Sequence, residues 1–474
     1  MKMSSSRQSA GTMSMARPMT WLLAYLFVSG VLYFFVTHFP LGPVRIVRPS
    51  VLDTWTPILP ATIPLYLSYL LVMPALVWLG RKSDWLLSAF FAGAIAAIAC
   101  LVSHLFWPTA IVRPVADSGW LAWLHRIDSP LAAVPSGHVA LPVAISVLLA
   151  ILRERSAWLF AIWSALLMVA VLTTGQHLSY DVACGAAVGV LAGAATAGLL
   201  RLRVDLRTTA MILVEWLCIV VTLRVALAAG TWWLYPVAFA IIATRQHALF
   251  ILYHDAAHYH LSRHRRCNDF LINVAIGVPG TVPIEFYRPL HLAHHRHVGT
   301  EQDPERRFLY RNQPWRFRPL DTISLVRQLL GDVLMLNTLR TMRAYRKAGG
   351  RFVRPTGPML AAAITVGVIL AIGTVGVLLQ KIRSFAEHSG GPNVTPDWDH
   401  WTYAWHVGWL GRLFIWPYHI NLHLQHHRNP NTAWHALPSE MLAGDRILSS
   451  HGLLALLWSG ARRRARARTG SRKP

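Results

Sequence analysis

Charged residues are scarce in this chain. Asp, Glu, Lys and Arg make up 14% of its 474 residues, whereas apolar residues make up 54%. A soluble globular domain has roughly 25% charged residues and about 45–50% apolar ones. Several apolar runs reach about 20 residues, the length that crosses the hydrocarbon of a bilayer. The composition excludes an ordinary soluble or disordered chain and predicts an all-α polytopic membrane protein.

Cysteine is scarce as well, with four residues in the whole chain. They are Cys100, Cys184, Cys218 and Cys267; three lie in apolar runs, and no two have the spacing of a metal site. We therefore expect neither disulfides nor an iron–sulfur cluster. The first apolar run, from Thr20, is too long for the core of a cleaved signal and lacks a small-x-small exit, so we expect no cleaved leader.

Acidic residues are outnumbered by basic ones, 21 against 45, which gives a net charge of +24. In a membrane protein this excess is typical of cytoplasmic loops that face anionic lipid. Seven of the last 14 residues are basic, and we interpret 441–474 as a solvated cytoplasmic tail. The charge therefore does not require a nucleic-acid partner, and we expect none.

Eight apolar runs precede residue 253. The predicted spans are 20–39, 57–80, 85–107, 139–152, 157–174, 182–200, 208–226 and 231–252. With a cytoplasmic N-terminus, the inner loops carry ten basic residues and the outer loops four, which favours that orientation. Three spans separate His177 from His254, so the regions around these two histidines are predicted to face opposite sides of the membrane.

Two polar motifs lie at span ends on the predicted outer face. Arg113-Pro114 and Pro135-Ser136-Gly137-His138 precede the fourth span, and His177 precedes Asp181 by four residues before the sixth. His177 could attack phosphorus while Asp181 holds its tautomer, and His138 could protonate the leaving oxygen. Arg113 and the amides around Ser136-Gly137 suit a phosphate group. The alternative is that these are interfacial polar residues that cap helix ends.

These motifs resemble the type-2 phosphatidic acid phosphatase superfamily, over about residues 55–200. The Thr-Thr-Gly-Gln-His form around His177 is most similar to the sphingomyelin and inositol phosphorylceramide synthase branch. The resemblance implies a six-helix bundle and a phosphohistidine on His177, oriented by Asp181, with His138 as the acid. Phe106 stands where the broad family has a lysine, and Ala170-Val171 stand where it has Ser-Arg.

Histidine is abundant in the second half, where 17 of the 23 fall between His247 and His435. Three clusters and one further residue supply nine imidazoles: His254, His258, His291, His294, His295, His423, His426, His427 and His388. Residues spaced by three or four share a helical face, as ligands of one metal must. One metal takes four to six ligands, so nine imidazoles suit a pair of metal ions, and imidazole suits iron, copper or zinc.

Three other interpretations of these histidines are open. They could titrate at the surface, but two separate His-x-x-His-His runs make that a poor explanation. They could bind haem, although haem ligands lie deep in apolar spans, whereas Arg288, Arg296, Asp303 and Arg428 flank the clusters. A zinc hydrolase uses about three ligands and an acidic base.

The clusters resemble the integral-membrane fatty acid desaturase superfamily over about residues 230–440, together with Gly299-Thr300-Glu301-Gln302-Asp303-Pro304 and the Arg-x-x-x-Glu-His element from Arg383 to His388. The resemblance implies a cytoplasmic centre of two non-haem iron ions with the nine histidines as ligands. It also implies O2 as co-substrate and oxidation of an unactivated C–H bond in an acyl or sphingoid chain. Asp255 and Asp303 are candidate partners of the ligands; the alternative is that they are a helix cap and a turn residue before Pro304. No electron-carrier motif is present, so we expect a ferredoxin or cytochrome b5-like donor in trans.

Two histidines pose a question of placement. If 359–380 crosses the membrane once, His388 lies on the outer side, away from the clusters; if the run breaks near Gly373, His388 returns to them. His419 lies four residues before His423, which makes it a possible extra ligand.

The sequence therefore predicts a bifunctional lipid enzyme, placed in the bacterial inner membrane and acting on membrane lipids of sphingolipid type. The expected parts are 1–54 (tail and first span), 55–200 (phosphatase-like), 201–229 (linker and span), 230–440 (desaturase-like) and 441–474 (tail). The first alternative is a desaturase alone, with the N-terminal half as a scaffold or lipid-binding module. The second is a haem-binding electron-transfer protein.

Overall fold

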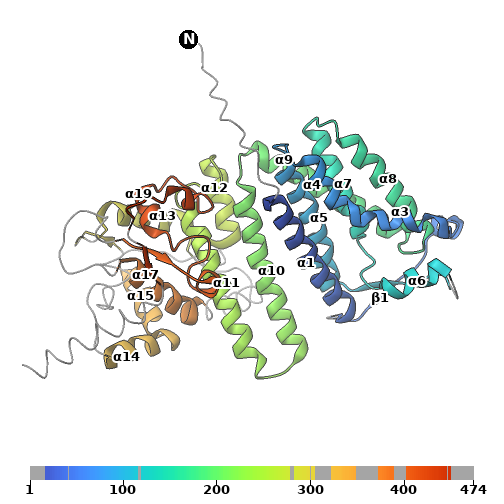
Figure 1. Ribbon diagram of the computed structural model, residues 1–474. Coiled ribbons are helices and arrows are strands. Elements are labelled where there is room, and N and C mark those ends of the chain that lie inside the picture. Colours follow the sequence, from blue (N-terminus) through green and yellow to red (C-terminus); the bar gives the residue numbers. More distant parts are fainter. Residues whose placement is uncertain are drawn as a thin grey trace, which may run out of the picture. The chain divides into compact units, whose positions relative to one another are not determined.

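The structure is a computed structural model that divides into two compact units, residues 1–201 and 202–474. It describes residues 16–40, 42–115, 119–277, 282–298, 300, 302–304, 322–347, 372–388, 402–445 and 447–449. Both units are built mainly from helices (Figure 1). The fold class is therefore the all-α polytopic membrane protein that the composition predicts.

The first unit consists of helices and one small strand pair. Its helices are α1 (Ala16–His38), α2 (Val51–Trp55), α3 (Ile63–Leu67), α4 (Val72–Gly80), α5 (Leu86–Phe106), α6 (Gly119–Ile127), α7 (Gly137–Ile151), α8 (Ala157–Thr173) and α9 (Ser179–Arg201). Strands β1 (Arg45–Val47) and β2 (Thr109–Ile111) pair in parallel, with Arg45 opposite Thr109.

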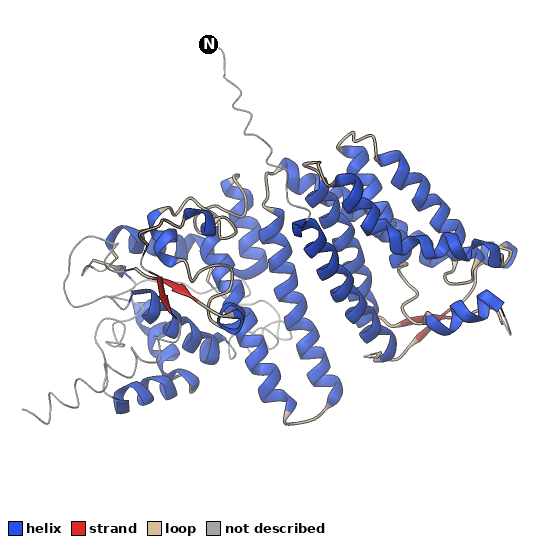
Figure 2. Cartoon of the chain, in the orientation of Figure 1, coloured by secondary structure: helices blue, strands red, loops and turns tan. Residues whose placement is uncertain are grey.

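The second unit begins with two long helices and continues in shorter elements. Its helices are α10 (Leu206–Ala229), α11 (Leu234–Ala256), α12 (Arg265–Ile272), α13 (Ile284–His297), α14 (Thr322–Val333), α15 (Leu336–Lys347), α17 (Val377–His388), α18 (Trp409–Phe414) and α19 (His423–Arg428). Strands β3 (Ala404–His406) and β4 (Ile447–Ser449) pair in parallel, and Figure 2 shows both strand pairs in red. These two pairs are the only named strands in the described residues; the rest is helix, loop and isolated β-bridges.

Six helical segments in the described residues are long and apolar enough to cross a bilayer. They are Pro18–His38, Pro60–Gly80, Leu86–Phe106, Ser179–Arg201, Leu206–Ala229 and Leu234–Ala256. The other two predicted spans correspond to α7 and α8, apolar helices of 15 and 17 residues. The segment Pro60–Gly80 is not one regular helix, because 3₁₀ turns at Pro60–Thr62 and Ser68–Leu71 flank α3 before α4 begins.

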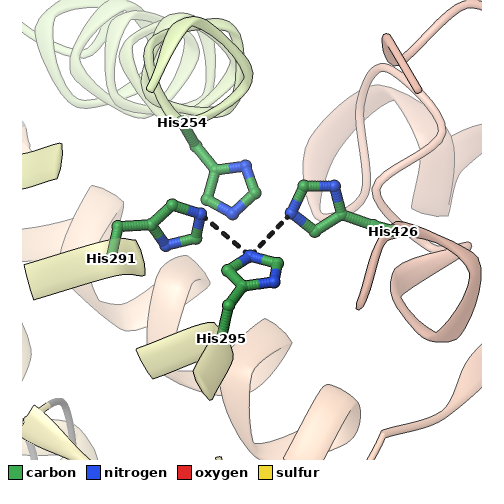
Figure 3. A group of neighbouring side chains, drawn as sticks. All are labelled: His254, His291, His295 and His426. Atoms are coloured by element: carbon green, nitrogen blue, oxygen red, sulfur yellow. Dashed lines mark hydrogen bonds between the residues drawn. The ribbon is translucent and has the colours of Figure 1, made fainter. Parts of the chain in front are cut away.

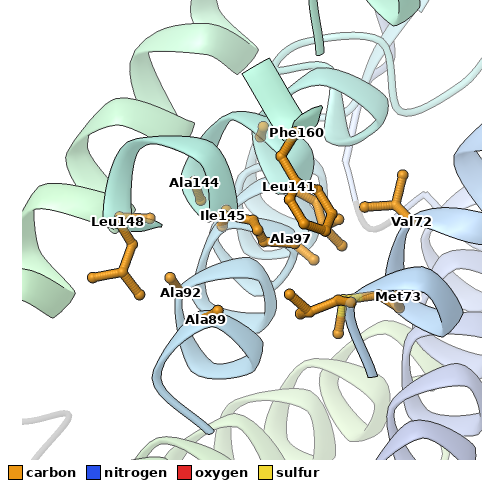
Figure 4. Close-up of a cluster of buried hydrophobic side chains, with 14 of the residues drawn as sticks. Val72, Met73, Ala89, Ala92, Ala97, Leu141, Ala144, Ile145, Leu148 and Phe160 are labelled. Carbon is orange, nitrogen blue, oxygen red and sulfur yellow. The ribbon is translucent and has the colours of Figure 1, made fainter. Parts of the chain in front are cut away.

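Helix α7 is the central packing element of the first unit, because it contacts α5, α8 and α9. Buried side chains from four helices meet on its apolar face: Val72 from α4, Ala92 from α5, Leu141 and Ile145 from α7, and Phe160 from α8 (Figure 4). This packing fixes the N-terminal end of α7, where Gly137 and His138 begin the helix.

The contact between α7 and α9 depends on three glycines spaced four residues apart on α9. A Cβ atom added to Gly185, Gly189 or Gly193 would lie 2.4, 2.5 or 2.7 Å from a backbone oxygen of Ser136, Ala140 or Ala144. Small residues at this spacing let two membrane helices approach closely. The approach brings the start of α9, which carries Asp181, next to the start of α7, where the Ser136 amide donates to the Asp181 carbonyl at 3.1 Å.

We expect Gly189→Ala to destabilise the first unit by about 1–3 kcal/mol, the usual cost of overpacking. The added methyl group would meet the Ala140 oxygen at 2.5 Å and the Val143 Cβ at 2.7 Å. Gly198→Ala on the same helix is the control, since a Cβ atom there meets nothing within 4 Å. Thermal unfolding of both variants in detergent micelles measures the difference. Equal melting temperatures would contradict close packing at Gly189.

The second unit holds its functional segments against α10 and α11. Glu215 of α10 pairs with Arg245 of α11 at 3.2 Å, and the Tyr418 hydroxyl donates to the same carboxylate. Arg245 also donates to the Leu413 carbonyl. The segment that leads into α19 is thereby tied to two long helices, and the buried rings of Trp405 and Trp416 pack beside it.

Candidate metal centre

Four imidazoles from three helices form a first group. His254 lies in the last turn of α11, His291 and His295 lie on α13, and His426 lies on α19. One nitrogen from each ring lies within 4.8 Å of the others. Nε2 of His295 is 3.1 Å from Nε2 of His291 and 3.1 Å from Nε2 of His426, and Figure 3 shows the four rings facing a common point.

Four further imidazoles form a second group. His294 comes from α13, His388 from the end of α17, and His423 and His427 from α19. Nε2 of His423 is 3.0 Å from Nε2 of both His388 and His427. All four side chains are buried.

Each His-x-x-His-His cluster is divided between the two groups. On α13, His291 and His295 join the first group while His294 joins the second. On α19, His423 and His427 join the second group while His426 joins the first. Residues four apart in a helix lie almost above one another, whereas residue i+3 points to the other side of that line. Two helices therefore supply both groups at once.

His258 lies beside the first group but outside its set of four. Helix α11 ends at Ala256, so His258 follows in a turn and is not on the same helix as His254. The next residue, Tyr259, has φ +64°, which turns the chain away. Nε2 of His258 still lies 2.8 Å from Nε2 of His291, at the edge of the group.

His388 lies with the clusters, as the alternative with a broken apolar run predicts. A π-helical turn, Ile372–Gly376, precedes α17, and α17 ends at His388 in the second group. The part of the run at 359–371 lies outside the described residues. His419 is in neither group; its ring stacks against Trp434 with centroids 6.3 Å apart.

Carboxylates hold several of these elements in place. Both oxygens of Asp303 lie 3.0 Å from Nδ1 of His294. Glu387 accepts two bonds from Arg383 at 2.8 Å and lies 3.7 Å from His423. From the sequence, Asp303 is a candidate partner of the ligands. Glu387 enters there only as part of the Arg-x-x-x-Glu-His element, without a role of its own, although its i+4 spacing from Arg383 was a usable signal.

Two other carboxylates act away from the grouped rings. Asp255 lies 2.7 Å from Nδ1 of His260, a histidine outside both groups, so it does not orient a grouped ring as predicted. Asp445 accepts hydrogen bonds from the side chains of Gln425 and Arg428 on α19. These contacts, the bonds from Arg428 above all, lower the pKa of Asp445 to about 2. The carboxylate thus braces the helix that bears three of the histidines.

We expect Asp303→Asn to weaken metal binding by about 10–100-fold, because such outer partners fix the tautomer and orientation of a metal ligand. Asp255→Asn is the matched comparison and is expected to have the smaller effect, since its partner His260 is in neither group. Retention of iron against increasing chelator concentration measures both. A larger loss in the Asp255 variant would contradict this assignment.

Burial favours the neutral, metal-binding form of five grouped rings. Burial lowers the pKa of His291, His295, His423, His426 and His427 far below the ordinary value, and neighbouring imidazoles lower it further. Burial, with His260 and Arg288, lowers the pKa of His258 to about 3. Protonated rings therefore do not compete with metal binding near neutral pH.

The spacing of the nitrogens fits one metal ion in each group. Two nitrogens at adjacent corners of an octahedron, each about 2.1 Å from the metal, lie roughly 3 Å apart. Four pairs of Nε2 atoms, two in each group, are 3.0–3.1 Å apart, and the ligand atoms of each group all lie within 4.8 Å of one another. Nε2 is the nitrogen positioned for a ligand role, because the Nε2 atoms are the ones that converge. Nδ1 of His291, His423 and His427 has no hydrogen-bond partner in the described part of the chain.

A separate pair of imidazoles lies in the first unit. Nδ1 of His138 is 3.3 Å from Nε2 of His177, and Nδ1 of His177 is 3.3 Å from Asp181. His138, His177 and Gly137 line a cavity of about 370 Å³ whose other walls are mostly apolar. The structure thus brings together the three residues predicted to catalyse phosphoryl transfer.

The predicted phosphate-binding residues are placed differently. Arg113 donates to the carbonyls of Asp128 and Ser129 at 2.7 Å and to the side chain of Gln176. These bonds commit its terminal nitrogens to holding a loop. Ser136 occupies the N-cap position of α7, but its hydroxyl makes no capping bond and has no partner among the described residues.

Comparison with known proteins assigns the second unit. The fatty acid desaturase family matches residues 230–452. The zeaxanthin 4-ketolase of Chlamydomonas reinhardtii is 26% identical over 227 residues, covering 46% of each chain. A beta-carotene ketolase of Haematococcus lacustris is 27% identical over 232 residues, covering 44% of this chain and 61% of the relative.

A third relative is the sn-1 acyl-lipid omega-3 desaturase (ferredoxin) of Nostoc sp. (strain 36). It is 23% identical over 221 residues, covering 44% of this chain and 55% of the relative. The chain thus spans about half to three-fifths of the length of these relatives. No solved structure matches the chain.

The C-terminal half therefore contains a fatty acid desaturase domain, which confirms that part of the predicted resemblance. The comparisons give no support for a phosphatase-type domain in the N-terminal half.

Proposed function

We propose that the C-terminal half is an O2-dependent oxidase that uses two non-haem iron ions to oxidise a C–H bond of an acyl chain or a carotenoid. The observation that carries the proposal is the pair of largely buried four-histidine groups inside the segment that the desaturase family matches. Bound there, iron supplies the one-electron chemistry that activates O2. The relatives include ketolases and an acyl-lipid desaturase, so the substrate class is wider than sphingolipids.

The chain's own residues position and shield this chemistry. Helices α13 and α19 each present imidazoles to both groups, so these two helices would hold both ions. Most of these rings are buried, so water is kept from the reacting atoms. No cysteine is in either group, which leaves no thiolate to be oxidised beside the metal.

The test uses the purified full-length protein, loaded with ferrous iron in lipid nanodiscs and supplied with reduced ferredoxin. Oleoyl phosphatidylglycerol and β-carotene are offered separately, and mass spectrometry follows loss of two hydrogens or gain of oxygen. We expect product from one of the two classes, dependent on O2 and iron. Protein that binds two irons but converts neither class would overturn the proposal.

We also propose that electrons arrive from a separate ferredoxin-like or cytochrome b5-like carrier. The name of the Nostoc relative specifies ferredoxin. The exposed arginines Arg340, Arg343 and Arg346 on α15 give that helix a positive face, which favours an acidic partner. Two further arginines that follow α15 in the sequence, Arg351 and Arg354, lie outside the described residues.

We propose a bacterial inner-membrane location, with the iron centre cytoplasmic and the His138–His177 pair on the outer side. Three span-length helices lie between His177 and His254, which supports opposite sidedness. Single cysteines placed in the 175–178 and 260–264 loops of a cysteine-free variant are expected to react with a membrane-impermeant thiol reagent from opposite sides. Labelling of both loops from the same side would overturn this topology.

A second candidate function for residues 55–200 is transfer of a phosphoryl group from a membrane lipid. The arrangement His138–His177–Asp181 beside a largely apolar cavity supports it. Nε2 of His177 would form a bond to phosphorus as the phosphorus–oxygen bond to the leaving alcohol breaks, and His138 would give that oxygen its proton. Water or a second alcohol would then release the phosphoryl group from His177.

The comparisons favour the narrower alternative, in which the first unit is a scaffold or a lipid-binding module and the desaturase domain alone is an enzyme. Vesicles that contain head-group-labelled phospholipid separate the two. Release or exchange of label by the full-length protein supports the second candidate function, and its absence across phospholipid classes supports the scaffold.

A further inference from the structure

Asp128 is a carboxylate with no part in the functions described so far. It follows α6 in a loop of the first unit, and its side chain is 15% exposed. The Tyr66 hydroxyl donates to it at 2.5 Å, the Tyr33 hydroxyl also donates to it, and Arg113 lies 3.9 Å away. Burial alone would raise the pKa of Asp128, but His138, the two tyrosines and Arg113 together hold it below the ordinary value. The group is therefore a charged acceptor at neutral pH.

Tyr66 connects this carboxylate to His138. Its hydroxyl oxygen lies 3.0 Å from Nε2 of His138. Because the hydroxyl proton is already donated to Asp128, that oxygen can only accept from the imidazole. His138 must then carry a proton on Nε2, which leaves Nδ1 to face His177 at 3.3 Å.

His177 has the corresponding arrangement with its own carboxylate. Asp181 is an acceptor only, so Nδ1 of His177 carries the proton and Nε2 presents a lone pair toward His138. Two lone pairs then face each other at 3.3 Å, and one added proton fits between them. When His138 holds that proton, its ring is a cation with a second N–H on Nδ1. This protonated form is the one in which His138 can act as an acid beside His177.

We propose that Asp128, acting through the Tyr66 hydroxyl, is a positioning residue that fixes the proton of His138 on Nε2 and directs Nδ1 toward His177. Each imidazole of the pair thus has its own carboxylate, Asp181 directly and Asp128 through one tyrosine. The effect of this tautomer on phosphoryl transfer rests on the second candidate function. The proposal that His138 carries its proton on Nε2 does not depend on that function.

The competing explanation is that Asp128 only ties helices together, since Tyr33 of α1 and Tyr66 of α3 both donate to it. Tyr33→Phe is therefore the matched control. It removes one tyrosine bond to Asp128 but leaves the Tyr66 contact with His138 in place. Tyr66→Phe removes the connection, and Asp128→Asn removes the charge at its end.

The first measurement is the ¹⁵N spectrum of the histidine side chains in the full-length protein in nanodiscs, with His138 assigned by its loss in His138→Gln. We expect a protonated Nε2 for His138 in the parent and in Tyr33→Phe. In Tyr66→Phe and Asp128→Asn we expect a mixture of tautomers. An unchanged His138 signal in Tyr66→Phe, or an equal change in Tyr33→Phe, would overturn the proposal.

The second measurement is phosphoryl turnover of head-group-labelled phospholipid in vesicles. We expect Tyr66→Phe and Asp128→Asn each to lower it about tenfold, less than the ~10²–10⁴-fold that a whole acid–base group contributes. The double variant is expected to match Tyr66→Phe alone, because both changes act on one connection; additive losses would overturn the proposed connection. If the parent lacks turnover, the second candidate function fails while the spectrum still decides the tautomer.

Discussion

Replacing His426 by alanine is expected to lower bound iron from about two ions per chain to about one and to abolish oxidation, since a site that loses one of four imidazoles no longer completes its ligand set. His426 belongs to the first group, whose other members come from α11 and α13. The second group keeps all four of its rings. Iron per chain by elemental analysis and product by mass spectrometry measure the two effects.

His427→Ala is the matched variant, because the neighbouring residue on the same helix belongs to the second group. It is expected to lose the other ion and the same activity, and the double variant to lose both ions. His406→Ala, at an exposed position on β3, is the control and is expected to keep both ions. If either single variant lost both ions, the two groups would not be separate sites.

Under the second candidate function, replacing His177 by alanine is expected to abolish phosphoryl turnover while leaving oxidation by the desaturase domain unchanged. His177 is the group whose Nε2 lone pair would attack phosphorus, and alanine leaves no nucleophile in its place. The two units are compact in themselves, so loss of one imidazole in the first does not remove an iron ligand from the second. Label release from phospholipid and oxidation product are measured on the same preparation.

His125→Ala serves as the control, because its ring contacts the Thr174 carbonyl at 3.2 Å and not the His138–His177 pair. This variant is expected to keep both activities. Phosphoryl turnover that survives in His177→Ala would contradict the second candidate function, and a fall in oxidation would contradict the independence of the two activities.

The long helices were predictable because each is a continuous apolar run. The predicted span 208–226 lies within α10, which covers Leu206–Ala229. The run 57–80 was predicted as one span, but Pro60 and Pro64 lie at its start, and the structure breaks there into short helical pieces. Proline has no amide hydrogen to donate, so the signal for a break was present in the sequence.

The histidine clusters were recognisable from their spacing, but their division between two groups was not. Whether His294 faces the same point as His291 depends on where α13 crosses α19, and that crossing is a tertiary feature. Spacing along one helix says which residues share a face and not which partners that face meets. For the same reason, the sequence left the placement of His388 open.

Asp128 and Asp445 were not found from the sequence at all. Each is a single acidic residue in a loop, and its partners lie far away along the chain: Tyr66 is 62 residues from Asp128, and Arg428 is 17 residues from Asp445. The strands β1–β4 were missed because three residues are too few to show the alternation of a strand. Contacts of this kind become visible only when the chain is folded.

The most direct test of the central claim is a crystal structure of the iron-loaded protein with anomalous diffraction measured at the iron absorption edge. The account predicts two iron peaks, one among His254, His291, His295 and His426, and one among His294, His388, His423 and His427. A single peak, or iron bound away from these eight side chains, would contradict it.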